Sequence, residues 1–180
     1  MTTVLEQKIN NFTCAVKKAI QDENWYAALA IALTLPDICG KLQNPSLGST
    51  KRYIGFFNDF LKPKYVHKIG ALEREHEFLN GNDMYALRCS FLHSGTIEIS
   101  SQRIQEVLNK FVFLAPDKVN GHIVHMHQLD KTLQLQIDMF CLEVIDGVEI
   151  WIKSYKNDEE IQARANSMID IIDPSNGVRI

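Results

Sequence analysis

Apolar residues recur at spacings of three and four over two long stretches, one near each end of the chain. That spacing matches one helical turn, so each stretch predicts a helix with an apolar face. The first face holds Leu5, Ile9, Phe12, Val16, Ala19 and Ile20, and the second holds Ile137, Phe140, Cys141, Val144, Ile145, Val148, Trp151, Ile152 and Tyr155. Because such faces must be buried against other elements, we expect a mainly α fold, a helical bundle.

Capping residues and prolines divide the rest of the N-terminal half into shorter helices. Asn24 is placed to cap a nearly apolar helix that Pro36 interrupts, while Asn82 and Gly95 are placed to start and end another. The expected helices are 25–35, 37–42, a segment from Ser49 or Thr50 to Leu61 that Pro63 stops, 82–94, a segment from Ser100 or Ser101 to about Lys110, and 159–172.

The pattern changes in the second half, where short apolar runs and period-two alternation replace the helical spacing. Strands are expected at residues 111–114, 122–127 and 133–137, separated by turn-forming residues. They predict a small antiparallel β insert at about residues 111–137. Such an insert is too small to fold alone, so the chain is expected to form a single domain over residues 1–180.

Composition excludes several classes of protein. The chain has 180 residues, 46% hydrophobic and 23% charged, which is ordinary globular usage rather than that of a disordered or fibrous chain. No apolar run reaches the ~18 residues needed to span a bilayer, and residues 1–11 lack a signal-peptide pattern. We therefore expect a cytoplasmic protein without membrane contact. The four cysteines form no C-x-x-C pair and are expected to be free, buried thiols.

Charge is unevenly distributed around a net value of −3. Residues 41–70 hold six Lys or Arg against one Asp, a local charge of +5, whereas residues 130–180 hold five basic and ten acidic residues. A basic segment on a mildly acidic protein permits a local site for a polyanion. The candidate RNA-binding residues are Lys51, Arg52, Lys62, Lys64 and Lys68. The alternative is an ordinary solvated surface.

The strongest functional signal is an arginine and a histidine five residues apart, Arg88 and His93, near the end of an expected helix. Arginine can bind a phosphate with several donors, and histidine can transfer a proton near neutral pH. On an ideal helix the two lie about 140° apart around the axis and about 7.5 Å apart along it, so the arginine must swing across to meet the histidine. In the alternative, Arg88 pairs with an acid such as Asp83 and His93 caps its helix.

The segment from Tyr85 to Gly95 resembles the HEPN superfamily, which is known by an Arg-x4–6-His motif late in a helical bundle. Arg88 and His93 match it with four residues between them, and Ser94-Gly95 is similar to the family's usual ending. The specific match covers about ten residues. The resemblance implies a four- or five-helix bundle, usually dimeric, with the motif at the dimer cleft. One departure is Cys89, because active members often carry a polar residue, commonly Asn, directly after the arginine.

Many members are metal-independent endoribonucleases of toxin, phage-defence or RNA-processing systems. The resemblance therefore implies that Arg88 and His93 cleave RNA through attack of the 2′-OH on the adjacent phosphorus, with no cofactor and no metal. It also implies a homodimer, with an antitoxin or another protein as a possible partner. Other members are catalytically silent, so the alternative function is a nucleotide- or protein-binding module.

A metal site at His122, His125 and His127 is a weaker interpretation, because a strand would place only two of them on one face.

Overall fold

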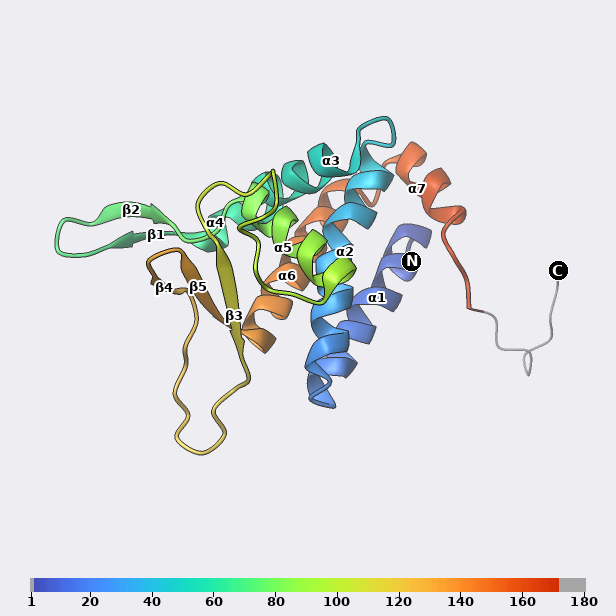
Figure 1. The fold of residues 1–180 in the computed structure, drawn as a ribbon. Helices are drawn as coiled ribbons and strands as arrows, with labels where there is room; N and C mark the ends of the chain where they lie inside the picture. Colours follow the sequence, from blue (N-terminus) through green and yellow to red (C-terminus); the bar gives the residue numbers. More distant parts are fainter. Residues whose placement is uncertain (1, 172–180) are drawn as a thin grey trace.

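The computed structural model describes residues 2–171, and in that part the protein is mainly α-helical with small β elements (Figure 1). This confirms the expected fold class. The helical elements are α1 (Val4–Gln21), α2 (Trp25–Gln43), α3 (Ser49–Phe56), a π-helical turn η1 (Phe57–Leu61), α4 (Lys62–Tyr65), α5 (Gly81–Ser94), α6 (Ile137–Tyr155) and α7 (Glu159–Asn166). The strands are β1 (Val66–Ile69), β2 (Arg74–Glu77), β3 (Lys110–Leu114), β4 (His127–Leu129) and β5 (Thr132–Gln136).

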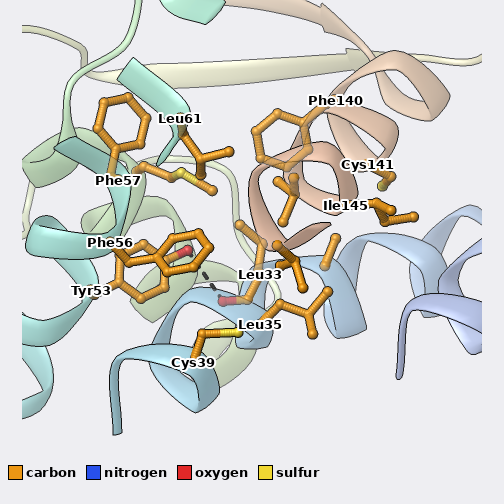
Figure 2. Close-up of a cluster of buried hydrophobic side chains, with 14 of the residues drawn as sticks. Leu33, Leu35, Cys39, Tyr53, Phe56, Phe57, Leu61, Phe140, Cys141 and Ile145 are labelled. Carbon is orange, nitrogen blue, oxygen red and sulfur yellow. Dashed lines mark hydrogen bonds between the residues drawn. The ribbon is translucent and has the colours of Figure 1, made fainter. Parts of the chain in front are cut away.

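Helices α1, α2 and α6 lie side by side and form the centre of the bundle (Figure 1). The two long apolar faces predicted from the sequence both lie in one buried cluster, in which Leu5, Ile9, Phe140 and Trp151 are fully inaccessible to solvent. Helix α3 and the π-helical turn add an aromatic layer that contains Tyr53, Phe56 and Phe57 (Figure 2). Burial of these side chains is the main favourable term in folding.

Helix α2 runs unbroken through Pro36, so the predicted break at this residue is wrong. Proline removes one backbone hydrogen bond, but α2 is buried along much of its length and tertiary packing outweighs that local cost. In the turn before the proline, the Tyr53 hydroxyl donates to the Leu33 carbonyl at 3.2 Å (Figure 2).

Among the described residues, α2 is the one helix long and apolar enough to cross a membrane. Half of that stretch is buried in the fold.

The segment from α3 to α4 forms one helical path that continues past Pro63, where the sequence predicted a stop. Pro63 lies in the first turn of α4, where a missing N–H is tolerated. Gly48, rather than Ser49 or Thr50, is the residue that precedes the first turn of α3, and no side chain caps it. Helix α7 ends at Asn166, earlier than expected, and the predicted end at Ile172 lies outside the described residues.

Two small sheets lie at one side of the bundle (Figure 1). The expected β insert is present as β3, β5 and β4. The predicted antiparallel pairing is found between β4 and β5, whereas β3 pairs with β5 in parallel, with Phe111 opposite Leu133. Residues 122–126 were expected in a strand but form a loop, and only His127 begins β4. The antiparallel hairpin of β1 and β2, which the sequence did not predict, projects away from the bundle.

The helix predicted from Ser100 or Ser101 to Lys110 does not form, because the Asp83 side chain holds this segment as a loop. Asp83 is fully buried, and its carboxylate accepts the backbone N–H of Glu106 at 2.7 Å and that of Leu108 at 3.0 Å. Asn80, not Asn82, caps α5 by accepting the Asp83 N–H. The predicted end of α5 is confirmed: Gly95 adopts the left-handed conformation with φ of 64°.

All four cysteines are free, but only two are buried as expected. Cys39 and Cys141 lie in the core, where burial raises the pKa of both thiols, that of Cys141 to about 12. Cys14 is exposed, and Cys89 is partly exposed beside the Arg-x4-His motif.

Two glycines in helices are expected to respond in opposite ways to substitution by alanine. A Cβ at Gly147 in α6 would lie 2.5 Å from Leu61 Cδ2 and 3.2 Å from the Phe60 carbonyl oxygen, whereas one at Gly55 in α3 would meet no atom within 4 Å. Gly147→Ala should lower the free energy of unfolding by about 1–3 kcal/mol through overpacking. Gly55→Ala should raise it by up to about 1 kcal/mol through helix propensity. Urea unfolding measures both, and stabilisation by both substitutions would contradict the close contact of α6 with η1.

Asp83→Asn is expected to lower the free energy of unfolding by about 3 kcal/mol, because the amide cannot accept all the backbone hydrogen bonds that the carboxylate holds. Asp146→Asn is the matched control: Asp146 is 59% exposed and pairs with Lys64 at the surface. That change should cost under about 1 kcal/mol. Equal effects of the two substitutions in chemical denaturation would show that Asp83 does not hold the loop.

Candidate functional site

Arg88 and His93 meet at the C-terminal end of α5, although an ideal helix separates their directions. Arg88 Nη1 lies 3.4 Å from His93 Nε2. Because a guanidinium can only donate, the imidazole nitrogen is the acceptor in this contact. His93 is exposed and the Arg88 side chain retains 20% of its exposure, so both groups are accessible to a ligand. The predicted pair therefore converges on one accessible position.

Asp37 of α2 is the acid that faces Arg88. Its Oδ2 lies 3.7 Å from Arg88 Nη2, while its Oδ1 accepts from Arg52 Nη2 at 2.8 Å and from Arg52 Nε at 3.3 Å. The alternative pairing of Arg88 with Asp83 is wrong, because that carboxylate is occupied by backbone N–H groups of the following loop. Two guanidiniums thus share one carboxylate, which leaves one positive charge in excess.

The Arg88 guanidinium also keeps an unused donor. Its Nε is buried and has no hydrogen-bond partner within residues 2–171. Buried polar groups in native proteins are nearly always paired, and a buried donor without a partner is destabilising. The excess charge makes the end of α5 suited to hold an anion, whereas the enclosed Nε is out of reach of a ligand in this structure.

The position of Arg52 depends on a close approach of α3 to α2. A Cβ at Gly40 would lie 2.9 Å from Arg52 Cβ and 3.1 Å from its carbonyl oxygen, so only glycine allows this spacing. Arg52 Nη1 also donates to the Leu47 carbonyl at 2.6 Å. The guanidinium is therefore fixed from two sides before any ligand binds, which lowers the entropy cost of using it.

Two hydroxyl groups extend the polar cluster along the contact of α3 with α5. The Ser49 hydroxyl lies 3.2 Å from the Tyr85 hydroxyl, and the Tyr85 ring packs edge-on against Tyr53 with centroids 5.4 Å apart. Burial raises the pKa of Tyr53 well above its usual value, so this phenol stays neutral. Tyr53 is therefore a packing residue, whereas Tyr85, which is only partly buried, presents a polar group.

The five residues predicted to bind RNA differ in their ion-pair partners. Arg52 joins the motif through Asp37, whereas three lysines pair with carboxylates elsewhere: Lys62 with Glu77, Lys64 with Asp146, and Lys68 with Glu73. Lys51 is exposed on α3 and has no ion-pair partner within the described chain. Only Lys51 and Arg52 thus lie on the helix that reaches the motif.

Asp37 is the residue that sequence reasoning missed. The sequence pattern predicts a helix that ends at Pro36, which places Asp37 at the start of a separate short helix. A continuous α2 instead carries Asp37 one residue beyond the proline on a rigid element. The signal available was its charge: within residues 25–40, a nearly apolar stretch, Asp37 is the only charged side chain.

Cys89 lies beside the guanidinium, at the position where the family resemblance leads one to expect a polar residue. Its Sγ is 4.0 Å from Arg88 Nη1. A thiol is a weak acceptor, so it orients the arginine less strongly than an amide oxygen would. In this chain the carboxylate of Asp37 faces the guanidinium from the other helix.

The three histidines near the β insert have separate partners. His125 Nε2 lies 3.0 Å from Glu143 Oε1, His127 Nδ1 lies 3.1 Å from Gln134 Oε1, and His122 Nδ1 lies 3.6 Å from Asp117 Oδ2. Within residues 2–171 no group of three or more His, Cys, Asp or Glu side chains is arranged to hold a metal ion.

The His125 contacts form a buried structural network. The Gln136 N–H donates to His125 Nδ1 at 3.2 Å, so the Nε2–H donates to Glu143. Tyr65 donates to the other Glu143 oxygen at 2.7 Å, and burial, with the neighbouring Glu143 carboxylate, raises the pKa of Tyr65 well above its usual value. The network joins the loop before β4 to α6 and α4.

Comparison with protein-family models, with curated proteins and with solved structures found no match to this chain. The resemblance to the HEPN superfamily therefore depends on the motif and its geometry alone.

The shared carboxylate predicts strong coupling between Asp37 and Arg52, whose side chains are only 21% and 12% exposed. Single and double alanine substitutions, measured by urea unfolding, should give a coupling energy of about 1–2 kcal/mol. The exposed pair Lys68 and Glu73, 3.7 Å apart, is the matched control and should give about 0.5 kcal/mol or less. Similar coupling in the two cycles would contradict the fixed geometry of Arg52.

Proposed function

We propose that the protein is a metal-independent endoribonuclease of the HEPN type, with Arg88 and His93 as its catalytic residues. The observation that carries the proposal is the 3.4 Å approach of Arg88 Nη1 to His93 Nε2 at an accessible position with excess positive charge. A phosphate bound there would contact the guanidinium and the imidazole together. These are the two groups that phosphodiester cleavage requires, one to offset charge and one to move a proton.

The reaction is a transesterification within the RNA chain. The 2′-OH attacks the adjacent phosphorus, a new P–O2′ bond forms, and the bond to the 5′-oxygen breaks to leave a 2′,3′-cyclic phosphate. The unprotonated Nε2 of His93 accepts the 2′-OH proton, and an imidazolium returns a proton to the leaving 5′-oxygen. Arg88 holds the phosphate and stabilises the charge that develops on its oxygens. DNA lacks the nucleophile and resists.

A homodimer would supply the second histidine for this exchange, because a second copy of α5 brings a second motif to the cleft. Apolar surface next to the motif supports such an association. Phe91 and Ile97, on either side of His93 in sequence, line a groove of about 310 Å³ with Trp25 and Tyr26, and Tyr26 is 81% exposed. We place the protein in the cytoplasm, in a toxin or phage-defence system, with an antitoxin or another protein as partner.

Substitution of either motif residue should strongly lower the rate of cleavage. His93→Ala is expected to lower the rate by about 10²–10⁴-fold through loss of proton transfer, and Arg88→Ala by about 10²–10³-fold through loss of charge stabilisation. The matched controls are His122→Ala, an exposed histidine, and Arg103→Ala, an exposed arginine on the loop after α5, and both should retain activity.

The measurement is cleavage of a ribo-oligonucleotide in the presence of EDTA, with detection of the 2′,3′-cyclic phosphate end. Activity that survives both motif substitutions would exclude the mechanism. Activity that EDTA removes would exclude the metal-independent reaction.

A second candidate function is a non-catalytic nucleotide- or protein-binding module. The observation in its favour is the environment of Arg88, which faces Asp37 and has Cys89, a weak acceptor, as its neighbour. In that case the wild-type protein would bind a nucleotide or a protein partner without cleaving any RNA. The EDTA cleavage assay separates the two functions directly.

A further inference from the structure

A pocket of about 510 Å³ opens between α2 and α7, on the other side of Asp37 from the motif. Its volume falls within the range of about 300–1,000 Å³ that is usual for small-molecule sites. Ile38, Leu42, Pro45 and Met168 supply apolar surface, and Asp37, Lys41, Arg52, Arg164 and Ser167 supply polar groups. The pocket thus offers flat apolar contact and charge in one concave site.

The charged lining is mostly positive and is held in place by backbone contacts. Arg164 Nε donates to the Leu42 carbonyl at 2.5 Å, and Lys41 Nζ donates to the Pro45 carbonyl at 2.7 Å. Arg52 is fixed by Asp37 and by the Leu47 carbonyl. Three cations and one carboxylate line the pocket, and Glu160 Oε2 lies 3.2 Å from Arg164 Nη1, which leaves a charge of +1 that favours an anionic ligand.

The pocket lies next to the proposed catalytic position, and Asp37 takes part in both. Asp37 and Arg52 line it, and the same Asp37 carboxylate lies 3.7 Å from Arg88. An anion held between Arg88 and His93 is therefore separated from the pocket by one side chain. A chain of nucleotides has negative charges at regular intervals and apolar base faces between them. It therefore matches a cationic position at Arg88 and His93 followed by a pocket with apolar and cationic lining.

We infer that the pocket binds the RNA nucleotide one position beyond the two that flank the linkage held by Arg88 and His93, an inference that rests on the proposed nuclease function. The base would lie against the apolar surface and the Arg164 guanidinium plane, as unpaired bases do in many RNA-binding sites. Lys41 would contact the flanking phosphate. The pocket then contributes to substrate binding at a distance from the reacting bond. A dinucleotide is too short to fill the pocket and does not gain this binding energy.

The test compares cleavage of a dinucleotide with cleavage of a hexanucleotide that has one scissile linkage and 2′-O-methyl groups elsewhere. Wild-type protein should show a higher kcat/KM for the hexanucleotide. Lys41→Glu and Arg164→Gln should lower kcat/KM for the hexanucleotide about tenfold or more and leave the dinucleotide unchanged. Lys131→Glu, on the turn between β4 and β5 at the other side of the molecule, is the charge-matched control and should change neither (Figure 1).

A binding measurement makes the inference independent of turnover. A hexanucleotide that is 2′-O-methylated throughout cannot react, and its affinity by fluorescence anisotropy should fall about tenfold with Lys41→Glu but not with Lys131→Glu. Lys41 is exposed, so its substitution tests the pocket even if Arg164→Gln unfolds the protein.

The outcomes separate the pocket from the nuclease. Suppose that the wild-type protein cleaves RNA and that Lys41→Glu and Lys131→Glu have the same hexanucleotide affinity and the same kcat/KM. That result overturns the pocket inference and leaves the nuclease proposal intact. No cleavage, with binding that Lys41→Glu weakens, overturns the nuclease and supports the pocket. Free 5′-AMP that binds more tightly than the hexanucleotide overturns the assignment to an RNA chain, because the pocket would then serve a free nucleotide.

Discussion

The Asp37 carboxylate joins the three helices on which the candidate site is built. One oxygen holds Arg52 of α3 and the other faces Arg88 of α5, while Asp37 itself lies on the buried α2. Because one negative charge serves two guanidiniums, the site remains cationic. Removal of this single carboxylate would place two like charges against each other without compensation.

That arrangement depends on the packing of the core around α2. The helix continues through Pro36 because its apolar surface is enclosed by α1, α3 and α6, and the Tyr53 hydroxyl bonds the Leu33 carbonyl in the preceding turn. Gly40 then lets the backbone of α3 approach closely enough to bring Arg52 to Asp37. Buried aromatic and aliphatic contacts thus hold the three helices in place, and the Asp37–Arg52 pair, whose side chains are 21% and 12% exposed, adds to them.

The helical spacing of apolar residues was enough to predict α1 and α6, because a long apolar face indicates by itself that a helix is buried on that side. The sequence failed where a contact from a distant segment decides the local structure. Asp83 turns the expected helix after α5 into a loop, tertiary packing carries α2 through Pro36, and the β1–β2 hairpin has no alternating pattern to reveal it. At the site, spacing within one helix predicted Arg88 and His93, but no local pattern connects Asp37 with either of them.

The central claim is that one phosphate fits between the Arg88 guanidinium and the His93 imidazole. The most direct measurement is a structure of the protein with a dinucleotide whose reacting 2′-OH is replaced by hydrogen, which blocks cleavage and retains the phosphate. We expect a phosphate oxygen within hydrogen-bond distance of Arg88 and the leaving 5′-oxygen or the 2′ carbon beside His93 Nε2. A dinucleotide bound elsewhere, with Arg88 and His93 still in contact with each other, would contradict the claim.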